Sequence, residues 1–241
     1  MRVFSYCSSR RHGSKTKKII DSLIGSMGEK ADVNSSLYDP IDNRINMCRG
    51  CTSCFKGEAC TLDVEDGFDK TKHDLLNADV VLLGTPVYAC SVSGDMKVFI
   101  DRISYLLHLM PLRGKTGIPI ITASSNSLIE TNNYLSKIMQ YLGLYVPFSV
   151  LCTVDEPNQF DSIAFENKLY EYAERIIGIH NGSEKRKASR LQETYFASLK
   201  NIYRTIGDKT SESRYWRDNN LFGFDTYQSL VDFIVESDEC I

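Results

Sequence analysis

The stretch VVLLGTPVYACSVSGDMKVFIDR, residues 80–102, carries the strongest structural signal in the chain. Its first five residues, 80–84, are apolar without alternation, which is typical of a strand buried on both faces of a parallel sheet. A turn that contains Pro86 follows and is expected to end the strand. Helical spacing then returns over residues 95–109. This order predicts one unit of an α/β fold.

The same order of strand, loop and helix recurs through the first 180 residues. We expect further strands at residues 2–7, 32–38, 116–123 and 145–152, and further helices at 14–27, 67–77, 128–142 and 163–179. Such alternation predicts an α/β fold with a doubly wound, five-stranded parallel sheet. Ligands of these sheets bind at the carboxyl ends of the strands, so the loops that follow the strands are candidate binding sites.

Residues 181–241 do not continue this pattern. They contain two segments with helical spacing, 191–206 and 227–236, and an aromatic-rich stretch with Trp216 and Phe222. We therefore expect a domain of residues 1–180 and a helical, aromatic-rich C-terminal extension of residues 181–241. The extension is expected to pack on the domain or on a second subunit, and its aromatic-rich residues 191–241 are the candidate for such an interface.

Composition and charge exclude several classes of protein. The net charge of −3 and the pI near 5.9 argue against a nucleic-acid partner, because phosphate binding needs an excess of Lys and Arg. No stretch reaches the roughly 18 apolar residues of a membrane-spanning helix. No apolar leader with a cleavage site follows Met1. We therefore expect a cytoplasmic protein without membrane or nucleic-acid partners.

The first candidate loop joins a predicted strand to a predicted helix. It carries the hydroxyls of Ser8, Ser9, Ser14 and Thr16 and the guanidinium of Arg10. Backbone N–H groups at a helix N-terminus bind phosphate, and hydroxyls add further donors. The glycine fingerprints of dinucleotide and P-loop sites are absent, so a monophosphate suits this loop better than a pyrophosphate. In the alternative interpretation, Ser14 only caps the helix.

Two further loops follow buried strands. Pro86 stiffens the first of them, and Tyr88 places an aromatic ring where a flat ring system could lie. The alternative is that Tyr88 is a half-buried aromatic of the core. The second loop, after the strand 116–123, offers the small polar side chains of Ser124, Ser125 and Asn126.

Together these loops resemble the flavodoxin-like superfamily, and more closely its NAD(P)H-dependent FMN reductase branch. CSSRRHGSKT, residues 7–16, is similar to the family's GSPRxxGNT-type phosphate loop, and TPVY with SGDMKVFIDR is similar to its SPxY…SGxMKxFxDR segment. The resemblance covers residues 1–180 and implies a flavodoxin-like domain that binds FMN without a covalent link. It also implies a homodimer or higher homo-oligomer. It assigns the phosphate to Ser8, Arg10, Ser14, Lys15 and Thr16, the isoalloxazine ring to Pro86, Val87, Tyr88 and Ala89, and the pyrimidine edge to Ser124, Ser125 and Asn126.

The chain departs from the family pattern at a few positions. Cys7 stands where the family usually has glycine, and Lys15 where it often has asparagine. The loop TASSNS, residues 122–127, lacks the glycine-rich sequence common in relatives. These changes leave phosphate binding intact and leave open the fit around the pyrimidine ring.

Four of the eight cysteines fall in the run CRGCTSCFKGEAC, residues 48–60. In a reducing compartment, thiols this close indicate metal or redox chemistry rather than disulfides. The spacing C-x2-C-x2-C-x5-C is similar to that of the iron–sulfur flavoproteins of the same branch, and this resemblance implies a 4Fe–4S cluster near the flavin. Four thiolates also suit a tetrahedral zinc ion, and a loop without metal is the third alternative. The candidate ligands are Cys48, Cys51, Cys54 and Cys60.

These features favour an FMN-dependent oxidoreductase with NAD(P)H as co-substrate, a 4Fe–4S cluster next to the flavin, and a small-molecule or protein redox partner. A cluster-free reductase of quinones, nitro compounds or free flavin is the runner-up. Two hypotheses from different classes are an FMN electron carrier without a substrate pocket and a zinc-stabilised binding module. No general acid or base is evident, and Asp101 and Arg102 are expected to form a structural pair at a helix end.

Overall fold

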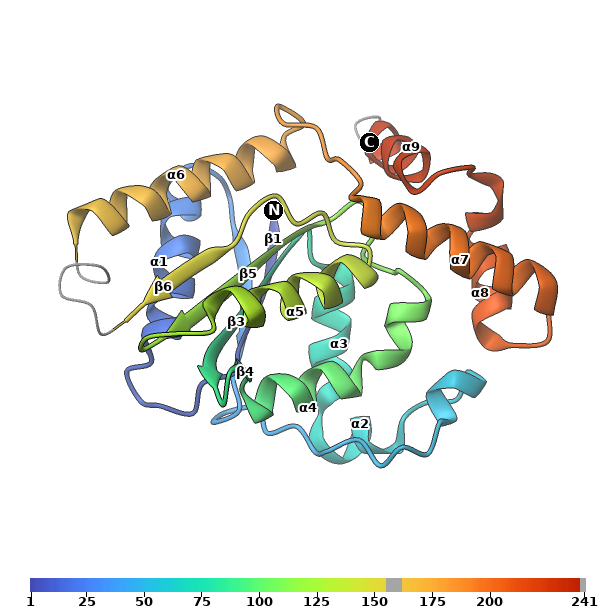
Figure 1. Ribbon diagram of the computed structural model, residues 1–241, viewed down its shortest axis with the longest axis horizontal. Helices are drawn as coiled ribbons and strands as arrows, with labels where there is room; N and C mark the ends of the chain where they lie inside the picture. The colour runs from blue at the N-terminus through green and yellow to red at the C-terminus, as the bar shows by residue number, and fades with distance from the viewer. Residues whose placement is uncertain (155–161, 239–241) are drawn as a thin grey trace.

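The chain forms a central sheet whose main ladder has five parallel strands (Figure 1). The structure is a computed structural model and describes residues 1–154 and 162–238. The strand order is β2-β1-β3-β5-β6. The five strands are β1 (Arg2–Cys7), β2 (Asn34–Tyr38), β3 (Val80–Tyr88), β5 (Thr116–Ala123) and β6 (Val150–Thr153). A sixth strand, β4 (Ser91–Val92), pairs antiparallel with the end of β3.

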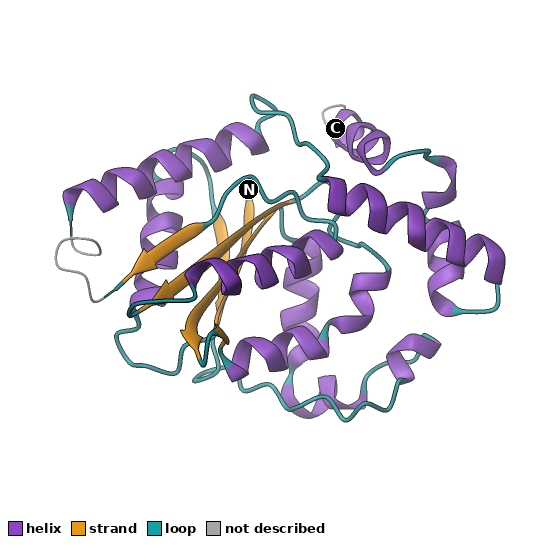
Figure 2. Cartoon of the chain, in the orientation of Figure 1, coloured by secondary structure: helices purple, strands orange, loops and turns teal. Residues whose placement is uncertain are grey.

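Helices cover both faces of the sheet, as Figure 2 shows. Successive side chains of β3 point to opposite faces: Val80 and Leu82 enter the core with α1 (Lys15–Gly28) and α6 (Ile163–His180). Val81 and Leu83 enter the other core, with the helices α3 (Phe68–Asn77), α4 (Gly94–Arg102) and α5 (Leu128–Tyr141). The predicted α/β, flavodoxin-like doubly wound sheet is therefore confirmed.

The bounds of three strands differ from the prediction. β2 begins at Asn34 instead of residue 32. β3 continues past Pro86 to Tyr88, because the residues beyond the proline pair with β4 in a short hairpin. β6 begins at Val150 instead of Tyr145, which contributes only an isolated bridge to Thr116. Pro147 lies between these two positions and lacks the N–H that a ladder requires.

Several helices differ as well. A short helix, α2 (Thr61–Asp66), precedes α3 and was not expected. The predicted helix 95–109 is divided into α4 and the 3-10 helix η2 (Ser104–His108). Near the C-terminus, α8 (Ser211–Asp218) was also missed, because its apolar face has only Trp216 as a large buried side chain.

The C-terminal residues form α7 (Arg190–Ile206), α8, the 3-10 turn η3 (Leu221–Gly223) and α9 (Tyr227–Asp238). Their buried aromatic side chains surround Met110 in one cluster, which includes Phe196, Tyr203, Trp216 and Tyr227. Trp216 Nε1 donates to the His108 carbonyl at 2.9 Å, and Tyr227 Oη donates to the Gly143 carbonyl at 2.6 Å. These aromatics are thus used for packing within the chain. The division at residue 180 stays a prediction.

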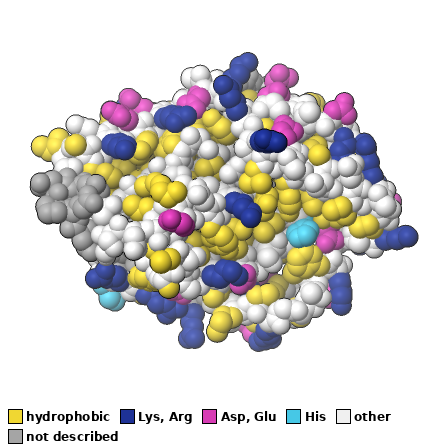
Figure 3. Space-filling view, viewed as in Figure 1, with side chains coloured by type: hydrophobic (Ala, Val, Ile, Leu, Met, Phe, Trp, Pro, Cys, Tyr) yellow, Lys and Arg dark blue, Asp and Glu magenta, His cyan; other side chains and the backbone are white. Residues whose placement is uncertain are grey.

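Charged side chains of both signs are interspersed on the face drawn in Figure 3. None of the helices in the described part of the chain combines the length and the apolar character that crossing a membrane requires.

Gly117 in β5 provides a test of the close packing of the sheet against α5. A Cβ there would lie 2.8 Å from Met139 Cε and 3.0 Å from Leu144 Cβ. We expect Gly117→Ala to lower the free energy of unfolding by about 1–3 kcal/mol through overpacking. Urea denaturation measures this change.

Gly25→Ala is the matched control. A Cβ added at Gly25, in α1, would meet no atom within 4 Å, so alanine should stabilise the helix by about 0.5–1 kcal/mol. Equal shifts of the same sign in both variants would contradict the packing described.

Candidate functional site

A pocket of about 360 Å³ lies at the carboxyl ends of β1, β3 and β5. Three loops line it: the loop before α1, the end of β3, and the end of β5 with Val154. In Figure 1 these loops lie where the strand arrows end. The lining residues are Ser9, Arg11, His12, Gly13, Ser14, Lys15, Thr16, Pro86, Val87, Tyr88, Thr122, Ala123, Ser124 and Val154.

The N-terminus of α1 forms one wall of the pocket. Ser14 is the N-cap, and its Oγ accepts from Lys17 N at 3.3 Å. Thr16 Oγ1 lies 2.7 Å from Thr122 Oγ1 and joins the first loop to the end of β5. The Lys15 ammonium donates to the Val154 carbonyl. Ser14 therefore caps the helix and also lines the pocket, while its contact with a phosphate stays a prediction. The positive end of the helix dipole faces this wall.

Gly84 allows α1 to approach β3 closely. A Cβ at this position would lie 2.7 Å from Ile20 Cδ1 and 2.9 Å from Thr16 Cγ2. Since any side chain here would push α1 outward, the glycine sets the position of the helix N-terminus at the pocket.

Two predicted phosphate residues lie behind the wall instead of in it. Ser8 is buried, its backbone N–H donates to the Gly84 carbonyl at 2.9 Å, and its Oγ lies 2.7 Å from Ser93 Oγ. Arg10 forms two hydrogen bonds to the Asp95 carboxylate, at 2.8 and 2.7 Å, and is largely exposed. Both residues fasten the first loop to the start of α4.

The end of β3 presents an open aromatic ring. Tyr88 is 50% exposed and lines the pocket, so it is no core aromatic. Ala89 and Cys90 form the tip of the hairpin with left-handed φ values of 48° and 61°. Such values are uncommon for residues other than glycine, asparagine and aspartate. Pro86 and Val87 line the pocket, whereas Ala89 lies beyond it.

The third loop contributes less than expected. Ser124 lines the pocket, while Ser125 and Asn126 are exposed beyond it. Thr122 and Val154 line the pocket but were not predicted. Thr122 stands opposite Pro86 in the parallel register, so its place at the carboxyl end of a buried strand was the available signal.

The cysteine loop, residues 48–60, contains a short 3-10 helix, η1 (Ser53–Lys56). Cys48 and Cys51 are exposed, Cys54 and Cys60 are half-buried, and all four thiols are free. Burial raises the pKa of Cys54, and the neighbouring Cys48 and Cys60 raise it further. Hydrogen bonds from Ser53 lower the pKa of Cys51. The sulfurs of Cys48 and Cys60 therefore influence that of Cys54, whereas Cys51 interacts with Ser53 in its own turn.

The donors of this loop fit a metal centre in kind and number. Four thiolates suit a 4Fe–4S cluster or a zinc ion. Across residues 1–154 and 162–238, however, no three His, Cys, Asp or Glu side chains are gathered in a metal-binding arrangement. The four thiols thus suit either metal group chemically, but in the described part of the chain they are not close enough together to bind it.

The cysteine loop docks against the C-terminal helices. Ser211 Oγ, at the start of α8, donates to the Phe55 carbonyl at 2.6 Å, and the Phe55 ring meets His108 edge-on with centroids 5.3 Å apart. In Figure 1, η1 (sky blue) lies beside α8, far from the loop before α1 (dark blue). The expected proximity of the thiols to the pocket is therefore not met within one chain.

The expected pair of Asp101 with Arg102 is not formed either. Asp101 accepts from Lys97 one helical turn earlier, at 2.5 Å. Arg102 points into the protein, toward Asp63 and Asp66. Adjacent residues on a helix point in different directions, which is why the two side chains separate.

Comparisons with known proteins agree with the fold and the loops. The family model for NADPH-dependent FMN reductase matches residues 1–158. An iron-sulfur flavoprotein of Archaeoglobus fulgidus is 29% identical over 143 residues, which are 57% of this chain and 61% of that relative. An iron-sulfur flavoprotein of Clostridioides difficile is 23% identical over 207 residues, which cover 85% of this chain and 90% of the relative.

Solved structures show the same architecture. RosB with a bound 8-demethyl-8-formylriboflavin-5'-phosphate intermediate has a TM-score of 0.62 at 13% identity, covering 87% of this chain and 88% of that one. An FMN-dependent NADH-azoreductase of Bacillus anthracis in complex with FMN has a TM-score of 0.55 at 12% identity, covering 73% and 98%. At these identities the likeness establishes the fold alone. The match of the family model over residues 1–158 shows that the chain belongs to the NADPH-dependent FMN reductase family.

Proposed function

We propose that this protein is an FMN-dependent oxidoreductase that takes electrons from NAD(P)H. The observation that carries the proposal is the pocket at the carboxyl edge of the sheet, where the N-terminus of α1, the end of β3 and the end of β5 meet. FMN supplies hydride and one-electron chemistry when bound, and the protein supplies binding, orientation and electrostatics. The electron acceptor is a small molecule or a protein.

The first loop would hold the phosphate. Ser14, Lys15 and Thr16 line the pocket at the helix N-terminus, where backbone N–H groups and the helix dipole favour an anion. Ser8 and Arg10 lie behind them and would hold the loop in shape through Gly84, Ser93 and Asp95.

The other two loops would hold the ring system. Pro86 and Val87 form a rigid edge, and the half-exposed ring of Tyr88 offers a face for stacking. Ala89, at the hairpin tip, would close this side. Ser124 would face the pyrimidine edge, with Ser125 and Asn126 beyond it.

The phosphate assignment predicts a difference between FMN and riboflavin, which lacks the phosphate. We expect Thr16→Val to weaken FMN binding by about 10- to 100-fold, the cost of losing one hydrogen bond to a charged group. Riboflavin binding should change far less, because riboflavin lacks the phosphate and is affected only by the loss of the contact between Thr16 and Thr122. Fluorescence titration of the flavin-free protein measures both affinities.

Ser22→Ala is the matched control for this test. Ser22 is exposed on the same helix and does not line the pocket, so both affinities should stay unchanged. Equal losses for FMN and riboflavin in Thr16→Val would contradict the phosphate assignment.

The reductase assignment predicts that NAD(P)H bleaches the flavin. Under anaerobic conditions, addition of NADPH or NADH to the FMN-loaded protein should remove the yellow absorption as the flavin is reduced. Stopped-flow absorbance measures the rate. A protein that stays yellow with both nucleotides, yet is reduced by dithionite, would instead be an electron carrier.

We further propose that the cysteine loop binds a 4Fe–4S cluster, with Cys48, Cys51, Cys54 and Cys60 as ligands. The number and softness of the donors and the iron-sulfur flavoproteins among the relatives support this. A bound cluster would supply one-electron transfer. We also propose a cytoplasmic location, where a reducing environment would keep these thiols available as ligands.

We also propose a homodimer or higher homo-oligomer, because the cysteine loop and the pocket lie apart within one chain. One chain keeps η1 beside α8 and away from the pocket (Figure 1), so electron exchange between the two sites would take place between subunits. The aromatic side chains first considered for the interface are mostly buried within the chain, and Ile202 and Phe233 remain exposed there.

The cluster proposal predicts the metal content of the protein. Protein purified without oxygen should contain about four iron and four sulfide per chain and be brown. Replacing Cys54 with serine should remove the iron and leave FMN binding intact. Light scattering of the same preparation should give a mass of at least two 27.3-kDa chains.

The same measurements separate the competing functions. If the protein contains one zinc ion per chain and no sulfide, the cysteine loop holds a structural zinc ion and not a cluster. If the protein contains neither iron nor zinc, it is a cluster-free reductase. If light scattering gives the mass of a single chain, the proposed oligomer is contradicted.

A further inference from the structure

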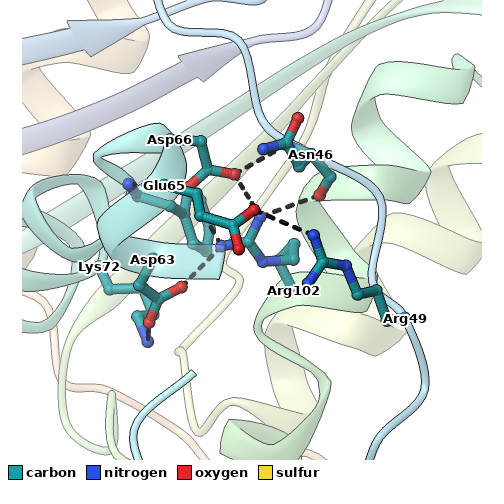
Figure 4. Close-up of polar contacts among 8 residues, drawn as sticks. Asn46, Arg49, Asp63, Glu65, Asp66, Lys72 and Arg102 are labelled. Carbon is teal, nitrogen blue, oxygen red and sulfur yellow. Dashed lines mark hydrogen bonds and ion pairs between the residues drawn. The ribbon is translucent and has the colours of Figure 1, made fainter. Parts of the chain in front are cut away.

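A buried arginine lies between the cysteine loop and the sheet. The Arg102 side chain, at the end of α4, is only 1% exposed. Its Nη2 donates to Asp63 Oδ1 at 2.7 Å, and its Nη1 donates to Asp66 Oδ2 at 2.5 Å. The guanidinium also lies 4.7 Å from the centroid of the Phe68 ring. Figure 4 shows these polar contacts, which attach α4 to α2.

The same guanidinium holds the opposite end of the cysteine loop. Arg102 Nη1 donates to the Asn46 carbonyl at 2.9 Å, and Asn46 N donates to Asp66 Oδ2 at 2.8 Å (Figure 4). Asn46 precedes Cys48 by two residues, and Cys60 is the N-cap of α2. Both ends of the loop therefore meet at one side chain.

The charges of this group balance. Two carboxylates, Asp63 and Asp66, face two cations, Arg102 and Lys72, and Lys72 donates to Asp63. Burying such a set adds little net stability, because desolvation offsets the attraction. It does impose a geometry, since a guanidinium fork with three separate acceptors fits only one arrangement.

We propose that Arg102 is a positioning residue of the cysteine loop. By fixing Asn46 against α2, it sets the separation of Cys48 and Cys60, the outer pair of the four thiols. The metal-binding part of this inference rests on the proposed function of the loop. The clamp itself is a property of the protein without metal.

Alkylation of the thiols tests the clamp directly. Metal-free, reduced protein is treated with iodoacetamide, and the rate at each cysteine is measured by peptide mass spectrometry. Lysine keeps the charge and loses the fork, so Arg102→Lys should raise the rates at the half-buried Cys54 and Cys60 about tenfold or more. Loaded with iron and sulfide, the variant should retain less iron than the wild type.

The chain contains internal references for this measurement. Cys7 and Cys152 are buried in the core and report global opening. Their rates should not change if Arg102 acts on the loop. If Cys7 and Cys152 accelerate as much as Cys54 and Cys60, Arg102 only stabilises the fold, and the inference is overturned.

Arg175→Lys is the control. Arg175, on α6, also uses its guanidinium fork, with both oxygens of Glu184 as acceptors at 2.8 and 2.7 Å, and it contacts neither the cysteine loop nor α8. Its replacement should leave the rates at Cys54 and Cys60 at the wild-type level. Equal acceleration in both arginine variants would overturn the inference.

Asp66→Asn covers the case in which Arg102→Lys fails to fold. It keeps the size of the side chain and loses the charge that binds Arg102, so the same two thiols should accelerate severalfold. Unchanged rates would overturn the clamp. If the wild type binds no metal while the alkylation pattern is as expected, the proposed function of the loop fails and the clamp stands.

Discussion

The burial of β3 and β5 on both faces is the constraint on which the structure depends. Val80, Val81, Leu82 and Leu83 are each 0% exposed, and every residue of β5 is buried. A sheet with two apolar faces must be covered on both sides, which accounts for the two layers of helices. The loops at the carboxyl ends of the strands, in contrast, carry polar side chains such as Ser14 and Ser124. The pocket arises there because three of these loops follow neighbouring strands.

Much of the fold could be predicted from the sequence because local pattern and burial agree. The bounds of β1 and β5 match the prediction, since each is a mostly apolar run followed by a polar loop. The pocket-lining role of Ser14, Thr16 and Tyr88 followed from their position after such runs. The directions of Ser8 and Arg10 could not be predicted, because they depend on Ser93 and Asp95, more than eighty residues away.

Helix α4 connects the two parts of the molecule in which chemistry is proposed. At its N-terminus, Ser93 caps the helix and contacts Ser8, and Asp95 holds Arg10. At its other end Arg102 holds the cysteine loop. Nine residues of helix span about 13 Å, so one short rigid element orients both loops. The segment SGDMKVFIDR, which resembles the family pattern, consists of this helix and its N-cap. The serine at its start contacts the first loop, and the arginine at its end holds the cysteine loop.

The contact of Ser211 with Phe55 spans 156 residues of sequence. Ribosomes add about 5–20 residues per second, so about eight to thirty seconds of synthesis separate the cysteine loop from the helix on which it rests. Arg102 follows the loop by far fewer residues and can engage it early. During translation, the two ends of the cysteine loop can therefore be fixed by Arg102 before η1 can dock on α8. For that interval the four thiols of a nascent chain are exposed to solvent.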